Sequence, residues 1–80
     1  MNKRIIKDVI EQARRGVQPD AADVRDLLAY NHESQAQAAY RIGVHPRTMR
    51  RAVSDADPYR LSPYAWAVLR LSYVVEGGVR

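Results

Sequence analysis

The sequence predicts an all-α fold, a compact bundle of five helices in one small domain. Three observations predict it: apolar residues recur at helical spacing, Ser or Asp residues suited to helix capping precede several of these stretches, and glycines end them. With 80 residues, the chain is expected to bury only about 60% of its unfolded surface. That leaves little room for an enclosed active site.

The first helix is expected over residues 2–15 and is amphipathic. Its apolar positions form one helical stripe, made of Ile5, Ile6, Val9, Ile10 and Ala13. Gly16 then ends the helix. Residues 1–16 are therefore assigned to an N-terminal amphipathic helix, and residues 17–80 to the remainder of the domain. The next helix of that remainder has Asp20 as its N-cap.

Residues 34–53 have the pattern of a helix-turn-helix. Ser34 can cap the first helix of the motif, and the small Ala38 and Ala39 allow a second helix to cross closely. Gly43 lies at the turn, where the chain needs a positive φ that glycine adopts most readily. The apolar residues expected to hold the two helices together are Ile42, Val44, Met49 and either Ala52 or Val53.

The second helix of the motif carries arginines on its outward side. Pro46 suits its first turn, because the missing N–H would have no partner there. Arg47 and Arg51 lie four residues apart on one face and are predicted to read bases, since arginine binds guanine through O6 and N7. Arg50 and His45 are further candidates for base contacts, although Arg50 could contact phosphate and His45 could simply cap the helix. This arrangement is typical of a helix that enters the major groove of DNA.

Polar side chains around the motif are predicted to contact DNA phosphates, which position a protein without reading sequence. These residues are Ser34, Gln35, Arg41, Thr48, Tyr59 and Arg60. Gln35 begins the first helix of the motif, and Arg60 follows the motif in the next loop. Arg41 could instead be solvated, and Tyr40 and Tyr59 could be packing residues.

The last helix is expected from about residue 63 to residue 76, with Ser62 as its cap and Gly77 at its end. One apolar face consists of Tyr64, Ala67, Val68, Leu71 and Val75, and a second consists of Trp66, Leu69 and Tyr73. Because so small a domain cannot bury both faces alone, the second face is predicted to form a homodimer interface. The alternative is that the first helix covers it within the same chain. A two-fold dimer would place its recognition helices about 34 Å apart and bind an inverted repeat.

Composition excludes several function classes. Lys and Arg number 13 against 9 Asp and Glu, a net charge of +4 that fits a polyanionic partner. The chain has no cysteine, and His32 and His45 lack companions at ligand spacing, so no metal and no cofactor are expected. The serines are better explained as caps than as nucleophiles, so we expect neither an enzyme nor a small-molecule substrate. No apolar run suits a bilayer or a signal peptide, which favours a cytoplasmic protein with no membrane partner.

A more specific pattern extends over residues 19–69. It comprises Pro19-Asp20, Val24-Arg25-Asp26-Leu27-Leu28, Ser34-Gln35, Ala38-Ala39, Gly43, Arg47, Met49-Arg50, Ser54-Asp55, Tyr59-Arg60 and Pro63-Tyr64. In these residues the chain resembles the anti-CRISPR-associated (Aca) regulators of phages and mobile elements. The resemblance implies a Cro/repressor-like homodimer that binds an inverted repeat in the promoter of an anti-CRISPR operon. Such a repressor also regulates its own gene, and the resemblance implies that Arg47 contacts a base.

Two other interpretations remain open from the sequence. Aca regulators carry basic residues directly after Ser-Gln, where this chain has Ala36 and Gln37, so the operator sequence can differ. A phage Cro-like repressor of another operon would have the same fold and the same arginines. An antitoxin or adaptor would use the last helix to bind a protein, with DNA binding secondary.

Overall fold

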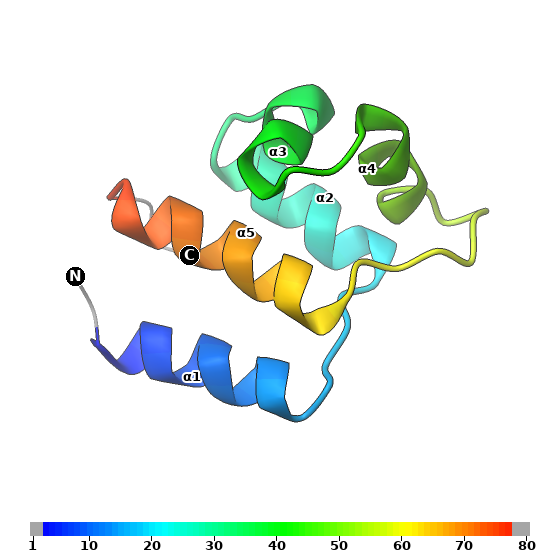
Figure 1. Cartoon of the computed structure of the whole chain (residues 1–80). Coiled ribbons are helices and arrows are strands. Elements are labelled where there is room, and N and C mark those ends of the chain that lie inside the picture. The colour runs from blue at the N-terminus through cyan, green and yellow to red at the C-terminus, as the bar shows by residue number, and fades with distance from the viewer. Residues whose placement is uncertain (1–2, 78–80) are drawn as a thin grey trace.

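The computed structural model describes residues 3–77, and in this range it contains five helices and no strands (Figure 1). The helices are α1 (Lys3–Arg14), α2 (Ala21–Tyr30), α3 (Gln35–Ile42), α4 (Pro46–Ala52) and α5 (Pro63–Val75). The all-α prediction is confirmed for these residues. The first and last helices each end one residue earlier than expected. None of the helices in this range is long and apolar enough to cross a membrane.

Helices α2, α3 and α5 begin directly after residues whose side chains cap them. The Ser34 hydroxyl accepts the Gln37 N–H at 3.1 Å, and the Gln37 side chain in return accepts the Ser34 N–H at 2.8 Å. Asp20 makes the same reciprocal arrangement with the third residue of α2. Ser62 accepts from the Ala65 N–H at 3.1 Å at the start of α5. These bonds satisfy backbone donors that have no partner within the helix, which explains where these three helices start.

Gly43 makes the turn between α3 and α4. Its φ of 70° and ψ of 27° lie in the left-handed region, as predicted. The next residue, Val44, donates its N–H to the Ala39 carbonyl at 3.0 Å and so closes the end of α3. The chain then reverses direction within a few residues before α4 begins at Pro46.

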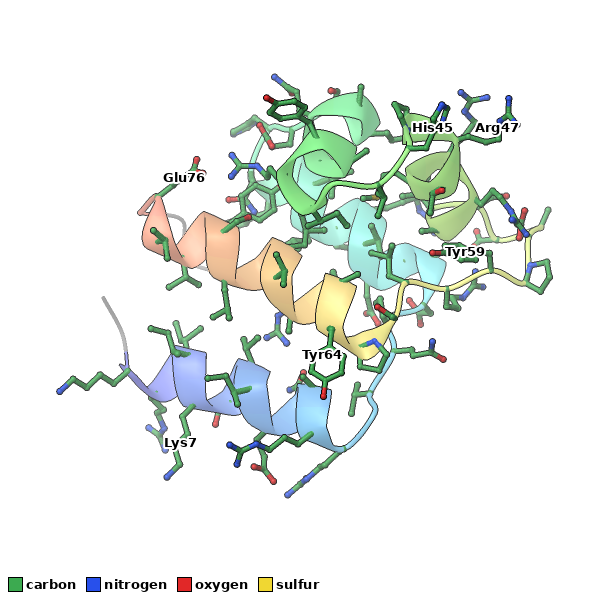
Figure 2. The ribbon with its side chains drawn as sticks, viewed as in Figure 1. Lys7, His45, Arg47, Tyr59, Tyr64 and Glu76 are labelled. Atoms are coloured by element: carbon green, nitrogen blue, oxygen red, sulfur yellow. The ribbon has the colours of Figure 1, made fainter. Side chains whose placement is uncertain are left out.

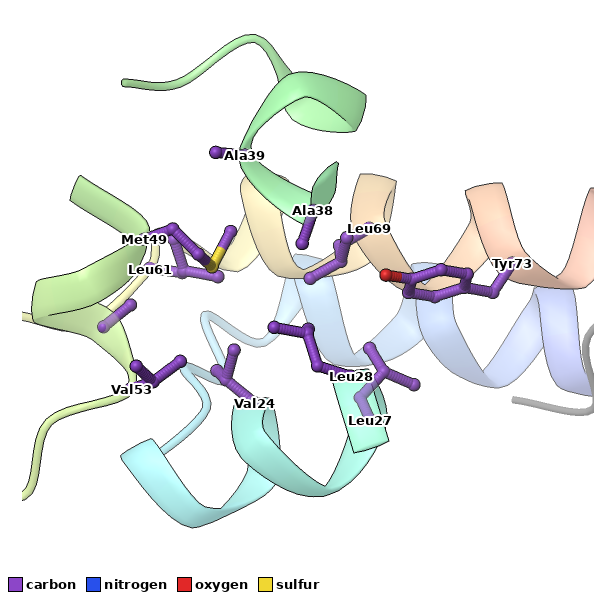
Figure 3. Packing of buried hydrophobic residues seen from close by; sticks show 11 residues of the cluster. Val24, Leu27, Leu28, Ala38, Ala39, Met49, Val53, Leu61, Leu69 and Tyr73 are labelled. Carbon is purple, nitrogen blue, oxygen red and sulfur yellow. The ribbon is translucent and has the colours of Figure 1, made fainter. Parts of the chain in front are cut away.

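The core lies where α2, α3, α4 and α5 meet (Figure 3). Ala38 and Ala39 are completely buried, and their small side chains let α4 approach α3 closely. Met49, Leu61 and Leu69 are the largest side chains fully buried there, and each contributes about 1.5–3 kcal/mol by leaving water. Both residues considered as alternative anchors of α4, Ala52 and Val53, are buried, while Ile42 and Val44 pack at the edge of this cluster.

Helix α5 lies between α1 on one side and the helices α2, α3 and α4 on the other (Figure 1). Ala67 and Val74 of α5 are buried, as is Val9 of the neighbouring α1. The Arg70 guanidinium donates to the Gln12 side-chain oxygen at 2.7 Å and links the two helices. The first helix thus covers one side of α5 within the same chain, but not the side of Leu69 and Tyr73 that the alternative interpretation had assigned to it.

This packing corrects the predicted dimer interface. Leu69 is 0% exposed and Tyr73 is 3% exposed, because both face α2 and α3 in the core of their own chain. Trp66 is half-buried against the same cluster. None of the three is therefore free to form the main contact with a second subunit. The residues of α5 that remain exposed, Tyr64, Val68 and Val75, belong to the other predicted face.

Candidate nucleic-acid interface

Helix α4 has one buried side and one exposed side. Met49 and Ala52 face the core, while His45, Arg47 and Arg50 are exposed. His45 and Arg47 project together from the start of α4, on the side of the molecule farthest from α1 (Figure 2). The helix is therefore anchored by apolar contacts on one side and presents polar and cationic groups on the other.

A polar contact from α2 also holds α4 in place. Arg25 of α2 donates from Nη1 to the Val53 carbonyl at 2.9 Å, just after the last turn of α4. The same nitrogen donates to the Asp55 carboxylate at 3.1 Å. Because a helix leaves its final carbonyls unbonded, this cation stabilises the end of α4 as well as its position.

His45 caps α4 and also points outward. Its Nδ1 accepts the Arg47 backbone N–H at 3.0 Å. An accepting Nδ1 carries no proton, so the neutral ring has its proton on Nε2. His45 therefore performs the capping role considered for it. Its Nε2–H remains an available donor at the exposed end of the same ring.

Arg47 and Arg50 are the uncompensated cations of α4. Both are exposed, and neither guanidinium has a hydrogen bond or ion pair to any other residue between 3 and 77. This matches the predicted position of these two candidates on the outward side. Their donors are free for an external acceptor.

Arg51 is arranged differently from Arg47. Its Nε and Nη2 donate to the two oxygens of Asp57, at 3.0 Å and 3.3 Å, and its guanidinium lies 5.1 Å from the centre of the Tyr59 ring. Pairing with Asp57 raises the pKa of Arg51 and lowers the pKa of the Asp57 carboxyl. Arg51 thus faces outward with its charge partly neutralised and its position restrained. That is a departure from the free base-reading side chain that was expected.

Asp57 is a site residue that the sequence interpretation missed. Besides binding Arg51, its carboxylate accepts the Tyr59 N–H at 2.8 Å, and its backbone carbonyl accepts from Arg60 Nη1 at 2.9 Å. Arg60 Nη1 also donates to the Tyr59 carbonyl at 2.6 Å. Arg60 therefore braces the loop after α4, which uses one of the nitrogens expected to bind phosphate.

Arg41 corrects another prediction. Its Nε pairs with Glu33 and its two terminal nitrogens pair with Glu76, the Nη2 distance being 2.9 Å. The guanidinium also stacks 4.4 Å from the centre of the Tyr73 ring, and the side chain is only 19% exposed. These carboxylates raise the Arg41 pKa. Because three of its five N–H groups already bind Glu33 and Glu76 and the side chain is largely buried, Arg41 is poorly placed for the expected phosphate contact.

The neighbouring Tyr40 is 87% exposed, so it is not the core residue that was considered. Among the remaining expected phosphate contacts, Gln35 is exposed at the first position of α3, and Ser34 is exposed beside it. The Ser34 oxygen accepts the capping bond, which leaves its hydroxyl proton available. Thr48 is half-buried on α4, and Tyr59 is half-buried beneath Arg51.

Between residues 3 and 77, no group of three or more His, Cys, Asp or Glu side chains is placed to hold a metal ion. Comparison of the chain with protein-family models, with curated proteins and with solved structures finds no match.

Proposed function

We propose that this protein is a sequence-specific DNA-binding regulator that places α4 in the major groove. The observation that carries the proposal is the two-sided construction of α4. Met49 and Ala52 fix it in the core, and Arg47 and Arg50 extend outward without a partner among the described residues. Arginine recognises guanine by two parallel hydrogen bonds, which requires an edge of the guanidinium whose N–H groups are free.

The surroundings of α4 support the same function. Gly43 sets a tight reversal between α3 and α4, and the alanines of α3 allow the close crossing that this motif requires. Gln35 and the Ser34 hydroxyl are exposed at the start of α3, where they can donate to a phosphate. His45 adds a donor at Nε2, beside Arg47. These contacts would fix the register of α4 in the groove.

We also propose a homodimer, with an interface different from the one expected from the sequence. Tyr64, Val68 and Val75 are exposed, and Leu71 is half-buried at the matching helical interval. Figure 2 shows Tyr64 extending from the start of α5 on the side of α1. An exposed apolar stripe on so small a domain suits a symmetric contact with a second copy, and two copies of α4 would then read an inverted repeat.

The resemblance to the Aca regulators supports a more specific role. On that resemblance, the protein represses the promoter of an anti-CRISPR operon that includes its own gene. A phage regulator of a different operon would use the same α4 surface. The DNA sequence that the protein selects would therefore identify the operon that it regulates.

Selection of bound duplexes from a randomised pool tests the proposal, followed by mobility-shift titration of the recovered site. Arg47→Ala should weaken binding by about 1–3 kcal/mol and relax preference at one base pair. Arg14→Ala on the exposed side of α1 removes the same charge and is the matched control. Equal affinities for the two variants, or recovery of no preferred sequence by the wild-type protein, would contradict the proposed function.

The dimer has its own test. Sedimentation should give a dimer for the wild-type chain and a folded monomer for Val68→Asp, and the recovered sites should be inverted repeats. A monomeric wild-type protein bound to an asymmetric site would remove the dimer from the proposal and leave DNA recognition by α4 intact.

A further inference from the structure

The Arg51 guanidinium is restrained on two sides. Asp57 binds one edge of the group, at Nε and Nη2, and the Tyr59 ring lies against it at 5.1 Å. Arg51 nevertheless remains 52% exposed. The side chain is thus accessible to an external group but has little freedom to choose its own orientation.

The contact with Asp57 leaves the adjacent edge of the guanidinium available. A guanidinium has five N–H groups, and Asp57 uses the one on Nε and one on Nη2. The two on Nη1 and the second on Nη2 have no partner among the described residues. The free edge, formed by Nη1 and Nη2, is one that can bind O6 and N7 of a guanine together.

Resting on the proposed function, we propose that Asp57 is a positioning residue that presents the free edge of Arg51 to a guanine. Asp57 does not touch the DNA in this arrangement. It fixes the plane and direction of the guanidinium before the complex forms, so that less side-chain freedom is lost on binding. Specificity at one base pair would then depend on a carboxylate in the loop after α4.

Asp57 is itself held firmly enough for this task. Its carboxylate accepts the Tyr59 N–H at 2.8 Å, and its carbonyl accepts from Arg60 Nη1 at 2.9 Å. The loop therefore supplies a fixed acceptor, and the Tyr59 ring supplies the surface beneath Arg51. Three residues of one loop restrain a side chain that belongs to the preceding helix.

Simple electrostatics predicts the opposite effect of removing this carboxylate. Asp57 carries a negative charge near the phosphates of the proposed DNA, so neutralising it should strengthen binding if charge alone matters. If Asp57 positions Arg51, neutralising it should weaken binding. The sign of the change separates the two effects.

Asp55 provides a matched control on the same loop. It is an exposed carboxylate that pairs with Arg25 at 3.1 Å, and no hydrogen bond or ion pair to Arg51 is present. Asp55→Asn changes the net charge by the same amount as Asp57→Asn. The amide introduced by Asp57→Asn keeps an oxygen that can accept the Tyr59 N–H, so the loop turn is preserved.

The experiment measures mobility-shift affinities for the duplex recovered from the randomised pool. A second duplex carries 7-deazaguanine at each selected guanine in turn, which removes the N7 acceptor. We expect Asp57→Asn to weaken binding about 3- to 10-fold, and Asp55→Asn to leave affinity unchanged or slightly increased. The 7-deazaguanine penalty should shrink in Asp57→Asn at a single guanine, the same guanine whose penalty disappears in Arg51→Ala.

The double variant completes the test. In an Arg51→Ala background, Asp57→Asn should no longer weaken binding, because the group that it positions is absent. Equal effects of Asp57→Asn with and without Arg51, tighter binding by Asp57→Asn, or an unchanged 7-deazaguanine profile would each overturn the inference while leaving α4 as the DNA reader. Absence of duplex binding by the wild-type protein would overturn the proposed function, and this inference with it.

Discussion

Gly43 permits a sharp test of how backbone conformation sets stability at the turn. Its φ of 70° is left-handed, and a Cβ added to it would have no heavy atom within 4 Å beyond its own chain neighbours. Gly43→Ala should therefore cost only the backbone term, about 1–2 kcal/mol. The unfolded chain loses freedom with alanine, which returns about 0.4–1 kcal/mol. The expected net loss in the free energy of unfolding is about 1 kcal/mol.

Urea denaturation and thermal unfolding measure this loss. For a domain of this size, about 1 kcal/mol corresponds to a fall in Tm of about 4–8 °C. Gly43→Asn should lose less, because asparagine adopts the left-handed region more readily than alanine. Gly16→Ala is a matched control, since Gly16 has φ of 74° and equally open surroundings at the end of α1.

The two alanine variants should be destabilised to similar degrees if backbone conformation is the cause. A Gly43→Ala protein as stable as the wild type would refute the reasoning. So would an asparagine variant as unstable as the alanine variant, because that result would implicate the added side chain rather than the sign of φ.

Three other predictions concern the core and the contacts between α3 and α5. Met49→Ala should lower the free energy of unfolding, measured by urea denaturation, by about 2–5 kcal/mol, and Met49→Leu should lower it by less than about 1.5 kcal/mol. Equal losses for the two variants would mean that Met49 is loosely packed. Arg41→Gln should lower the free energy of unfolding by about 1–3 kcal/mol, because the half-buried Glu33 loses a charged partner. The DNA affinity of the folded protein should stay unchanged. Weaker DNA binding at unchanged stability would restore Arg41 as a phosphate contact. Burial raises the pKa of Tyr73 from 10.0 to about 12, so stability is fully present below pH 10 and should fall by about 2–3 kcal/mol as the pH rises toward 12. Tyr73→Phe should remove that part of the alkaline loss in denaturation curves at several pH values, and an unchanged curve would assign the loss to other groups.

The helix boundaries were predictable because local rules decide them. Ser34 and its partner Gln37 are three residues apart, and Gly43 needs its conformation for a turn formed by its immediate neighbours. Such features depend on a few consecutive residues, so they can be predicted from the sequence. The anchoring of α4 by Met49 follows from the same local spacing.

The residues whose positions were predicted wrongly have partners far away in the chain. Tyr40 and Arg41 are neighbours on α3, and the pattern of that helix does not distinguish which of them turns toward α5. Arg41 turns toward α5 because its guanidinium binds Glu76, which is 35 positions away in the sequence. The same difficulty affects α5, which is apolar on more than one side, so periodicity alone does not identify the side that α1 covers.

The role of Asp57, in the loop after α4, was not predicted for a different reason. Asp57 fits the composition of a turn, and its carboxylate does accept a backbone N–H within that turn. The same carboxylate also binds Arg51, six residues earlier, and no sequence rule for turns includes that second task. A residue with an adequate local explanation therefore also belongs to the candidate site.

Because α4 is short, one copy of the protein could recognise only a few base pairs. The seven residues of α4 rise about 10 Å along the helix axis, the length of roughly three stacked base pairs. With four distinguishable pairs at each step, such a reader would accept about one random position in 60. Two copies reading together would accept about one in 4,000, so pairing of subunits would determine selectivity as well as affinity.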